Sequence, residues 1–192
     1  FQQIVAETEE RGCSVSAGGG LHTTGFGAKA LVEDLPLVLE ILADMLAAPT
    51  FPPDEVERLR GQFLTGLRES EEETGTQAGR AARQLLFPPE HPYSRPSSGS
   101  IATVQAIARD DLVAFHRRYH PAGGAIAIVG DVDVAAVIGA LEAGLGRWEP
   151  AAEPPRLELP PAPPLQGAQR RAIPMPGKVQ SDLVWAVHGL RR

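Results

Sequence analysis

The sequence predicts an α+β protein in which helices are grouped between short strands. Apolar residues recur at helical spacing in several segments, most regularly over 35–47. Two alternating segments, 13–17 and 22–30, flank a glycine run and predict a β-hairpin. A continuous apolar run at 125–129 predicts a buried strand with no neighbouring strand in sequence. Local and non-local strand connections among grouped helices favour an α+β layer arrangement.

The first fifty residues predict helix, hairpin and helix in that order. Residues 1–11 have the pattern of the end of an amphipathic helix, and Gly12 is expected to stop it. Glycines 18–20 permit the unusual dihedral angles of a turn between the two strands. The helix over 35–47 begins with a proline in its first turn, where the missing N–H costs little, and Pro49 ends it.

The middle of the chain predicts further helices. Residues 54–73 form a long helix with five apolar residues directed inward: Val56, Leu59, Phe63, Leu64 and Leu67. Residues 77–86 form another, stopped by two prolines. Ser100 is expected to be the N-cap of a short helix. Residues 110–119 and 134–145 are expected to be helices on either side of the buried strand.

The domain organisation follows from one composition shift. Residues 1–149 are expected to form most of one domain, and 150–167 a Pro-rich linker. Residues 168–192 are expected to contribute the first strands, 170–173 and 183–188, of a following domain. Because these strands cannot bury a core alone, we expect them to be flexible, folded back on the first domain or paired with another copy. We expect a chain without residues 151–192 to remain folded.

Composition excludes several functions. A net charge of −6, from 18 basic and 24 acidic residues, argues against nucleic-acid binding, which needs a concentrated basic face. Cys13 is the single cysteine, so an internal disulfide and a multi-cysteine metal site are excluded. No apolar run approaches the length of a membrane span. Because the chain opens on Phe1 inside a helical pattern, we expect it to be part of a longer protein, and its compartment stays open.

The stretch from His91 to Asp133, HPYSRPSSGSIATVQAIARDDLVAFHRRYHPAGGAIAIVGDVD, carries a family resemblance. Its turn, two helices, strand and Gly-Asp break resemble the closing half of a domain of the M16 zinc peptidases, the pitrilysin, insulinase and mitochondrial processing peptidase-like family. The resemblance covers nearly the whole chain. It implies the metallohydrolase fold of that family, with a mostly antiparallel sheet and helices packed on one side.

The family's zinc-binding motif, His-x-x-Glu-His, does not occur at any of the five histidines. The resemblance places the later glutamate ligand of active members at Gly66 or Thr65, and neither can supply a carboxylate. We therefore predict no catalytic residue and no metal ligand in this chain. The alternatives are Glu69, which requires a register shift, and His116 with His120, whose four-residue spacing suits a metal but also suits a helix C-terminal cap.

The resemblance also implies the parts that the chain plays in a larger protein. The strand residues Ser14, Val15, Ser16, Ala17 and Gly18 lie where active members pair with an extended substrate. We expect a non-catalytic domain that helps to enclose peptide substrate and packs against a catalytic M16 domain or subunit, which holds the zinc. The alternatives are the remainder of an active zinc endopeptidase whose motif lies upstream, and a structural or assembly subunit.

Overall fold

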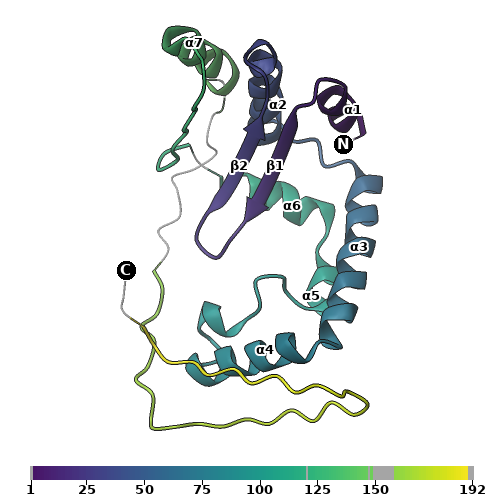
Figure 1. Ribbon diagram of the computed structural model, residues 1–192, viewed down its shortest axis with the longest axis vertical. Helices are drawn as coiled ribbons and strands as arrows, with labels where there is room; N and C mark the ends of the chain where they lie inside the picture. The colour runs from purple at the N-terminus through teal and green to yellow at the C-terminus, as the bar shows by residue number, and fades with distance from the viewer. Residues whose placement is uncertain (1, 120, 147, 149–157, 190–192) are drawn as a thin grey trace. The chain divides into compact units, whose positions relative to one another are not determined.

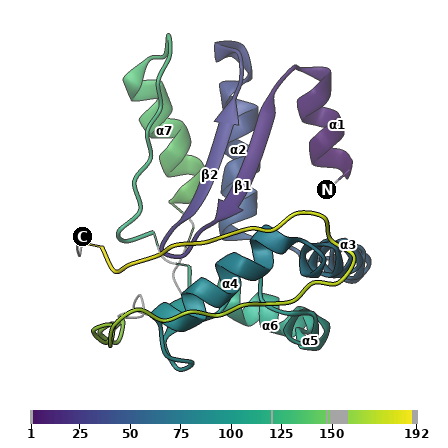
Figure 2. The same cartoon turned by 60° about the horizontal axis from the view of Figure 1, so that its bottom comes forward.

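The computed structural model describes residues 2–119, 121–146, 148 and 158–189, and it divides the chain into two compact units. The first unit comprises 1–55 and 108–155, and the second 56–107 and 156–192. Figure 1 and Figure 2 show the elements of both units. Helices and an antiparallel hairpin together confirm the α+β class.

The first unit is built on a hairpin. β1 (Ser14–Gly19) pairs with β2 (Thr24–Lys29) in antiparallel register, with Ala17 opposite Phe26. β1 continues through Gly18 and Gly19, which the sequence assigns to the turn. The connection is Gly20 to Thr23, closed by a 2.8 Å hydrogen bond from Gly20 N to Thr23 O. α1 (Gln2–Glu10) packs beside β1, and Gly12 ends it with a φ of 65°, as predicted.

The core of this unit lies on α2. The short 3₁₀ turn η1 (Val32–Asp34) leads into α2 (Leu35–Ala47), whose bounds are those that the sequence predicts. α2 runs along one face of the hairpin in both views (Figure 1, Figure 2). Its buried residues are aliphatic: Val38, Leu39, Ile41 and Ala43. Burial of one stripe of an amphipathic helix is the main stabilisation that this region shows.

Two later helices complete the first unit. α7 (Val134–Leu145) has the predicted bounds and packs on α2. Gly144 permits this approach, because a Cβ there would lie 3.0 Å from the Ala43 Cβ. α6 (Arg109–His116) is shorter than predicted, since Arg117 is already its C-cap residue.

The second unit is helical with an extended segment. α3 (Pro53–Glu71) belongs mainly to it and is followed by α4 (Thr74–Leu86). The 3₁₀ turn η2 (Pro92–Ser94) and α5 (Ile101–Ala106) come next, and Ser100 caps α5 as predicted, with Thr103 N donating to Ser100 Oγ at 3.2 Å. Residues 158–189 lie in the same unit as α4 and run extended beside it (Figure 2).

Three predicted strands are wrong within the described residues. Residues 125–129, 170–173 and 183–188 belong to no strand ladder there. Val129 is 98% exposed and Leu183 is 91% exposed, so these apolar runs are also not buried. A strand becomes regular only when a neighbouring backbone supplies its hydrogen bonds, and apolar composition does not supply that neighbour. Of the predicted linker, 150–157 lie outside the described residues, and the rest has no regular structure.

The apolar stripe of α3 is also less covered than predicted. Leu67 is buried, but Leu59 and Phe63 are 47% and 57% exposed. None of the helices in the described part of the chain has both the length and the apolar character needed to cross a membrane.

Candidate functional site

The residues predicted to meet substrate all lie on β1. Ser14, Val15, Ser16, Ala17 and Gly18 occupy consecutive positions, and within the described residues β2 is the one strand paired with β1. The Ser16 hydroxyl donates to Gly27 O at 3.2 Å. A Cβ on residue 27 would lie at the same 3.2 Å from Ser16 Oγ, so glycine there leaves room for this contact. The hairpin therefore has one edge of β1 outside the ladder.

The position that the resemblance assigns to the glutamate ligand lies on α3. Thr65 and Gly66 are both exposed, and Thr65 Oγ1 donates to Gly61 O at 3.0 Å. This bond is made inside the helix, one turn back, so the hydroxyl is already used by the backbone. Glu69, the alternative ligand, follows one turn later and is exposed.

His116 is the alternative ligand on α6, and one of its ring nitrogens already has a hydrogen-bond partner. Its Nε2 lies 2.8 Å from Leu46 O. Because a carbonyl only accepts, Nε2 carries the hydrogen and cannot ligate a metal in this arrangement. Its ring also meets Phe51 edge-on, with centroids 5.9 Å apart. The sequence predicts a contact with the carbonyl end of its own helix, whereas the partner is the end of α2. His120 lies outside the described residues.

The candidate ligands at Thr65, Glu69 and His116 do not fit a zinc site. Among the described residues, no group of three or more His, Cys, Asp or Glu side chains is placed to hold one ion. Hydrolytic zinc needs three protein ligands and an open position for water, and His116 has one nitrogen already committed to a carbonyl. No hydrolytic step can be derived for these side chains.

A small apolar hollow of about 210 Å³ lies in the first unit, next to His116. It is lined by residues of β2, α2, α6, the connector after α2 and the segment that follows α6: Phe26, Met45, Leu46, Pro49, Phe51, Leu112, Phe115, His116 and Tyr119. Phe51 has a φ of 46°, which is strained for an aromatic residue. Arg109 holds this connector, since its Nε donates to Phe51 O at 2.7 Å and its Nη2 to Thr50 O at 3.0 Å.

The sequence did not reveal the buried role of His91. This side chain is 2% exposed, and it accepts from Tyr93 N through Nδ1 at 3.1 Å. Its Nε2 therefore carries the hydrogen and donates to Pro160 O at 3.0 Å. Phe87 stacks on the ring with centroids 4.7 Å apart. The sequence does contain a signal for this role. A histidine directly precedes a proline at the start of the 3₁₀ turn, and its ring nitrogen can be the acceptor that an N-cap needs.

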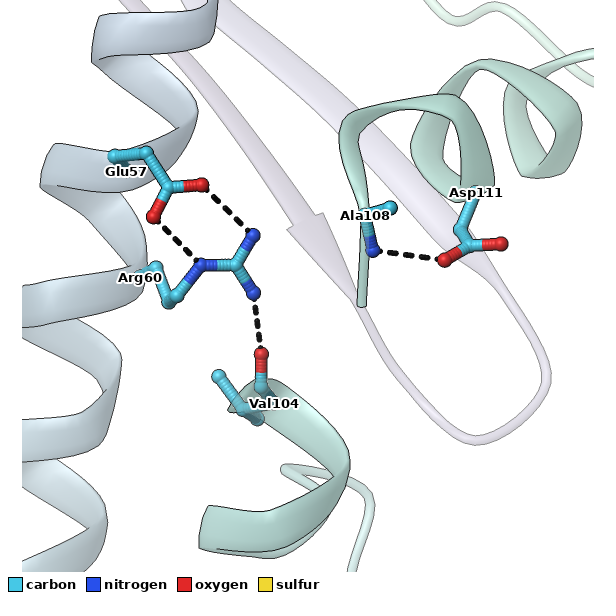
Figure 3. Close-up of polar contacts among 5 residues, drawn as sticks. All are labelled: Glu57, Arg60, Val104, Ala108 and Asp111. Atoms are coloured by element: carbon cyan, nitrogen blue, oxygen red, sulfur yellow. Dashed lines mark hydrogen bonds and ion pairs between the residues drawn. The ribbon is translucent and has the colours of Figure 1, made fainter. Parts of the chain in front are cut away.

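An ion pair on α3 fixes the end of α5 (Figure 3). Arg60 donates to both carboxylate oxygens of Glu57 at 3.0 Å, and its Nη1 reaches the carbonyl of Val104. The hydrogen bond from Arg60 lowers the pKa of the Glu57 carboxyl, and desolvation opposes this shift in part. Figure 3 also shows Asp111 accepting from Ala108 N, at 2.7 Å, where α6 begins.

Comparison with known families gives two matches. The model described as Insulinase (Peptidase family M16) matches residues 2–85, and the model described as Peptidase M16 inactive domain matches residues 106–192. Together they account for most of the chain. The gap between them contains the turn with His91.

Proteins with similar sequences are named as proteases or peptidase subunits. An uncharacterized zinc protease of Streptomyces coelicolor is 29% identical over 136 residues, which are 68% of this chain and 29% of that protein. The human mitochondrial-processing peptidase subunit beta is 30% identical over 118 residues, covering 56% of this chain and 22% of the subunit. The chain thus spans less than a third of the length of these relatives.

Solved structures agree on the fold. A peptidase M16 inactive domain from Pseudomonas fluorescens superposes with a TM-score of 0.73 at 24% identity, over 83% of this chain and 39% of that one. The first half of a periplasmic protease from Escherichia coli gives 0.69 at 20% identity, over 82% and 35%. The predicted resemblance is confirmed, and the chain belongs to the M16 peptidase family.

Proposed function

We propose that this chain is a non-catalytic M16-type domain that helps to enclose a peptide substrate and packs against a catalytic M16 domain or subunit. In this proposal zinc belongs to the catalytic partner. The chain contributes a strand edge for the substrate backbone and a surface for the partner, but no ligand and no general base.

One observation carries the non-catalytic part. The position that the resemblance gives to the later glutamate ligand is occupied by Thr65 or Gly66, and the Thr65 hydroxyl is bonded within α3. A glycine and a helix-bonded threonine supply no negative charge to a metal. The match of residues 106–192 to a sequence model described as an inactive domain supports the same conclusion.

The enclosing role rests on β1. Strand addition requires an edge whose N–H and C=O groups are outside any ladder, and β1 has such an edge within the described residues. Backbone pairing of this kind would hold a peptide without regard to most of its side chains. The domain organisation belongs to the same proposal: 1–149 as most of one M16-type domain, 150–167 as linker and 168–192 as the start of another.

A second candidate is the remainder of an active zinc endopeptidase. The match of residues 2–85 to the insulinase model, and the zinc protease names of the relatives, favour it. The two candidates differ in what the surrounding polypeptide supplies. A catalytic motif on the same domain supports the second, and a motif on a separate domain or subunit supports the first.

Metal content and peptidase activity test the non-catalytic part. Chain purified without a histidine tag should hold well under one zinc per molecule after dialysis, and it should not cleave unstructured peptides. Chelator-sensitive cleavage by this chain alone would contradict the proposal. Cleavage that appears only on addition of a polypeptide with His-x-x-Glu-His supports it.

Paired proline substitutions test the strand edge. Successive residues of a strand direct their N–H groups to opposite edges, so one of Val15→Pro and Ser16→Pro removes a donor to β2 and the other a donor at the outer edge. We expect one variant to weaken the hairpin. The other should keep the fold and lose about fivefold in affinity for a fluorescent unstructured peptide, because one backbone hydrogen bond contributes about 1 kcal/mol.

The control is Lys29→Ala at the end of β2, which should leave peptide affinity unchanged. Equal affinities for both proline variants and the parent chain would exclude β1 as the substrate strand. That result would leave the zinc and cleavage measurements as an independent test of the non-catalytic part.

A further inference from the structure

The first turn of α4 receives an acidic group from far along the chain. Its own N-cap residue, Glu73, makes no side-chain cap bond. Instead, Asp182 accepts a hydrogen bond from the Thr74 hydroxyl. The carboxylate also lies over the next residue, since a Cβ on Gly75 would be 3.9 Å from Asp182 Oδ2. A negative charge at this position interacts favourably with the positive end of the helix dipole.

The last turn of α4 receives a donor from the same segment. His188 Nε2 lies 3.1 Å from Leu86 O, the carbonyl of the final helical residue. The final carbonyls of a helix have no partner inside it, so this bond uses an acceptor that the helix leaves open. Because a carbonyl only accepts, Nε2 is the donor. The His188 ring also packs near Phe87, with centroids 5.5 Å apart.

The spacing of the two contacts matches the helix. Six residue steps of extended chain from Asp182 to His188 span about 20 Å. Twelve steps of helix from Thr74 to Leu86 span about 18 Å. A carboxylate and an imidazole six residues apart on an extended segment therefore reach both ends of α4. The segment runs beside α4 in both views (Figure 1, Figure 2).

Little apolar burial supports this contact. Side chains of an extended segment alternate between two faces, so three large residues between the two contacts point away from the side that carries Asp182 and His188. Leu183, Trp185 and Val187 are accordingly 91%, 84% and 65% exposed. The segment is held by polar contacts at its ends, with Lys178 Nζ 3.6 Å from Glu72 as a further exposed one. Exposed polar contacts of this kind contribute little each.

We propose that residues 178–189 form a strap that docks reversibly on α4 through its two ends. Asp182 recognises the start of the helix, and His188 recognises its end. The docked strap places a carboxylate beside the first turn of α4 and supplies a donor to its last carbonyl, and release leaves both groups to water. Because each contact contributes little, the docked state is favoured by a small margin only, so the strap is a two-state element of the second unit whose balance shifts toward release when its contacts are lost.

A distance measurement between spin labels tests the strap. In a Cys13→Ser background, labels are placed at Arg83→Cys on α4 and Leu183→Cys on the strap, two exposed positions outside the contacts. The parent protein should give a short, narrow distance distribution. Asp182→Ala with His188→Ala should give a longer and broader one. A broad distribution in the parent, or an unchanged one in the double variant, overturns the proposal.

Single variants separate the two contacts. Asp182→Ala should raise hydrogen exchange about fivefold at residues 77–80, whose N–H groups make the first helical hydrogen bonds of α4, the factor that corresponds to a lost contact of about 1 kcal/mol. Thr74→Ala removes the same contact from the helix side and should give the same increase. Ser181→Ala, in the same segment, is the matched control and should change nothing. Equal exchange in Asp182→Ala and the control contradicts the role of Asp182.

The charge on Asp182 is tested by Asp182→Asn. This variant retains a hydrogen-bond acceptor and loses the interaction with the helix dipole, so exchange should lie between the parent and Asp182→Ala. Exchange equal to the parent would overturn the role of the charge. Unchanged far-ultraviolet circular dichroism in each variant shows that α4 itself remains folded.

Discussion

The two units of this chain hold their segments together in different ways. In the first, a hairpin and two helices meet over aliphatic side chains, with Val38 2% and Ile41 6% exposed. In the second, His91 and Ser94 are among the most buried residues, and both hold loops through hydrogen bonds to backbone carbonyls. Apolar burial tolerates small changes in geometry, whereas a buried polar contact depends on one partner in one place.

The difference predicts where substitutions have the largest effect. Apolar truncation should be most severe in the first unit. Loss of a hydrogen-bonding side chain should be most severe in the second. The four predictions below run from the largest expected effect to the smallest.

Ile41→Ala should cost about 2–5 kcal/mol in the free energy of unfolding, because it removes a buried branched side chain and leaves a cavity. Denaturant unfolding measures the effect. Glu40→Ala, exposed on the next position of α2, is the control and should change little. Hydrogen exchange provides a second test. If protection falls as much in α4 as in α2, the two units unfold together, and the proposed difference between them is contradicted.

His91→Phe should cost about 2 kcal/mol. The ring volume is kept, but Tyr93 N and Pro160 O lose their partners, and a buried polar group without a partner costs about 1–3 kcal/mol. Hydrogen exchange at residues 93–95 should rise. His91→Asn retains an acceptor at the N-cap and should recover part of the loss. A neutral His91→Phe would show that apolar packing, rather than the two hydrogen bonds, holds this turn.

Two glycines of α7 provide a matched pair. Gly139→Ala meets no atom within 4 Å and should stabilise the protein by about 1 kcal/mol through helix propensity. Gly144→Ala places its Cβ 3.0 Å from the Ala43 Cβ and should gain less, or lose stability. Combining it with Ala43→Gly should relieve the contact, giving a coupling energy of about 1 kcal/mol in a double-mutant cycle. Additive effects would mean that α7 does not pack on α2 at this point.

The smallest effect should come from Glu57 and Arg60. The hydrogen bond from Arg60 lowers the pKa of Glu57, so this pair favours folding at pH values above the ordinary carboxyl pKa. The contribution disappears as the pH falls through the lowered pKa of the folded state. An NMR titration of the Glu57 carboxyl should show a lowered midpoint that returns toward its ordinary value in Arg60→Gln. Added salt should reduce the shift, since the Glu57 carboxylate is exposed to solvent.

The sequence was sufficient for most helices. The bounds of α2 and α7, the long α3 and the cap at Ser100 follow from residues within one or two turns of each other. The predicted β1 residues also lie on a strand. The assignment of substrate contact to that strand, the domain boundaries and the absence of metal ligands stay predictions, because they concern contacts with a peptide, another domain or an ion.

What the sequence determined by itself is the local part of the structure. Helix hydrogen bonds join residues four apart, so periodicity, caps and prolines place their ends. Tertiary structure decided everything that needs a distant partner. It left 125–129 and 183–188 without a ladder, gave His91 its carbonyl 69 residues away at Pro160, and brought Asp182 and His188 to the two ends of α4. Such contacts depend on which segments meet in space, and no local pattern encodes that choice.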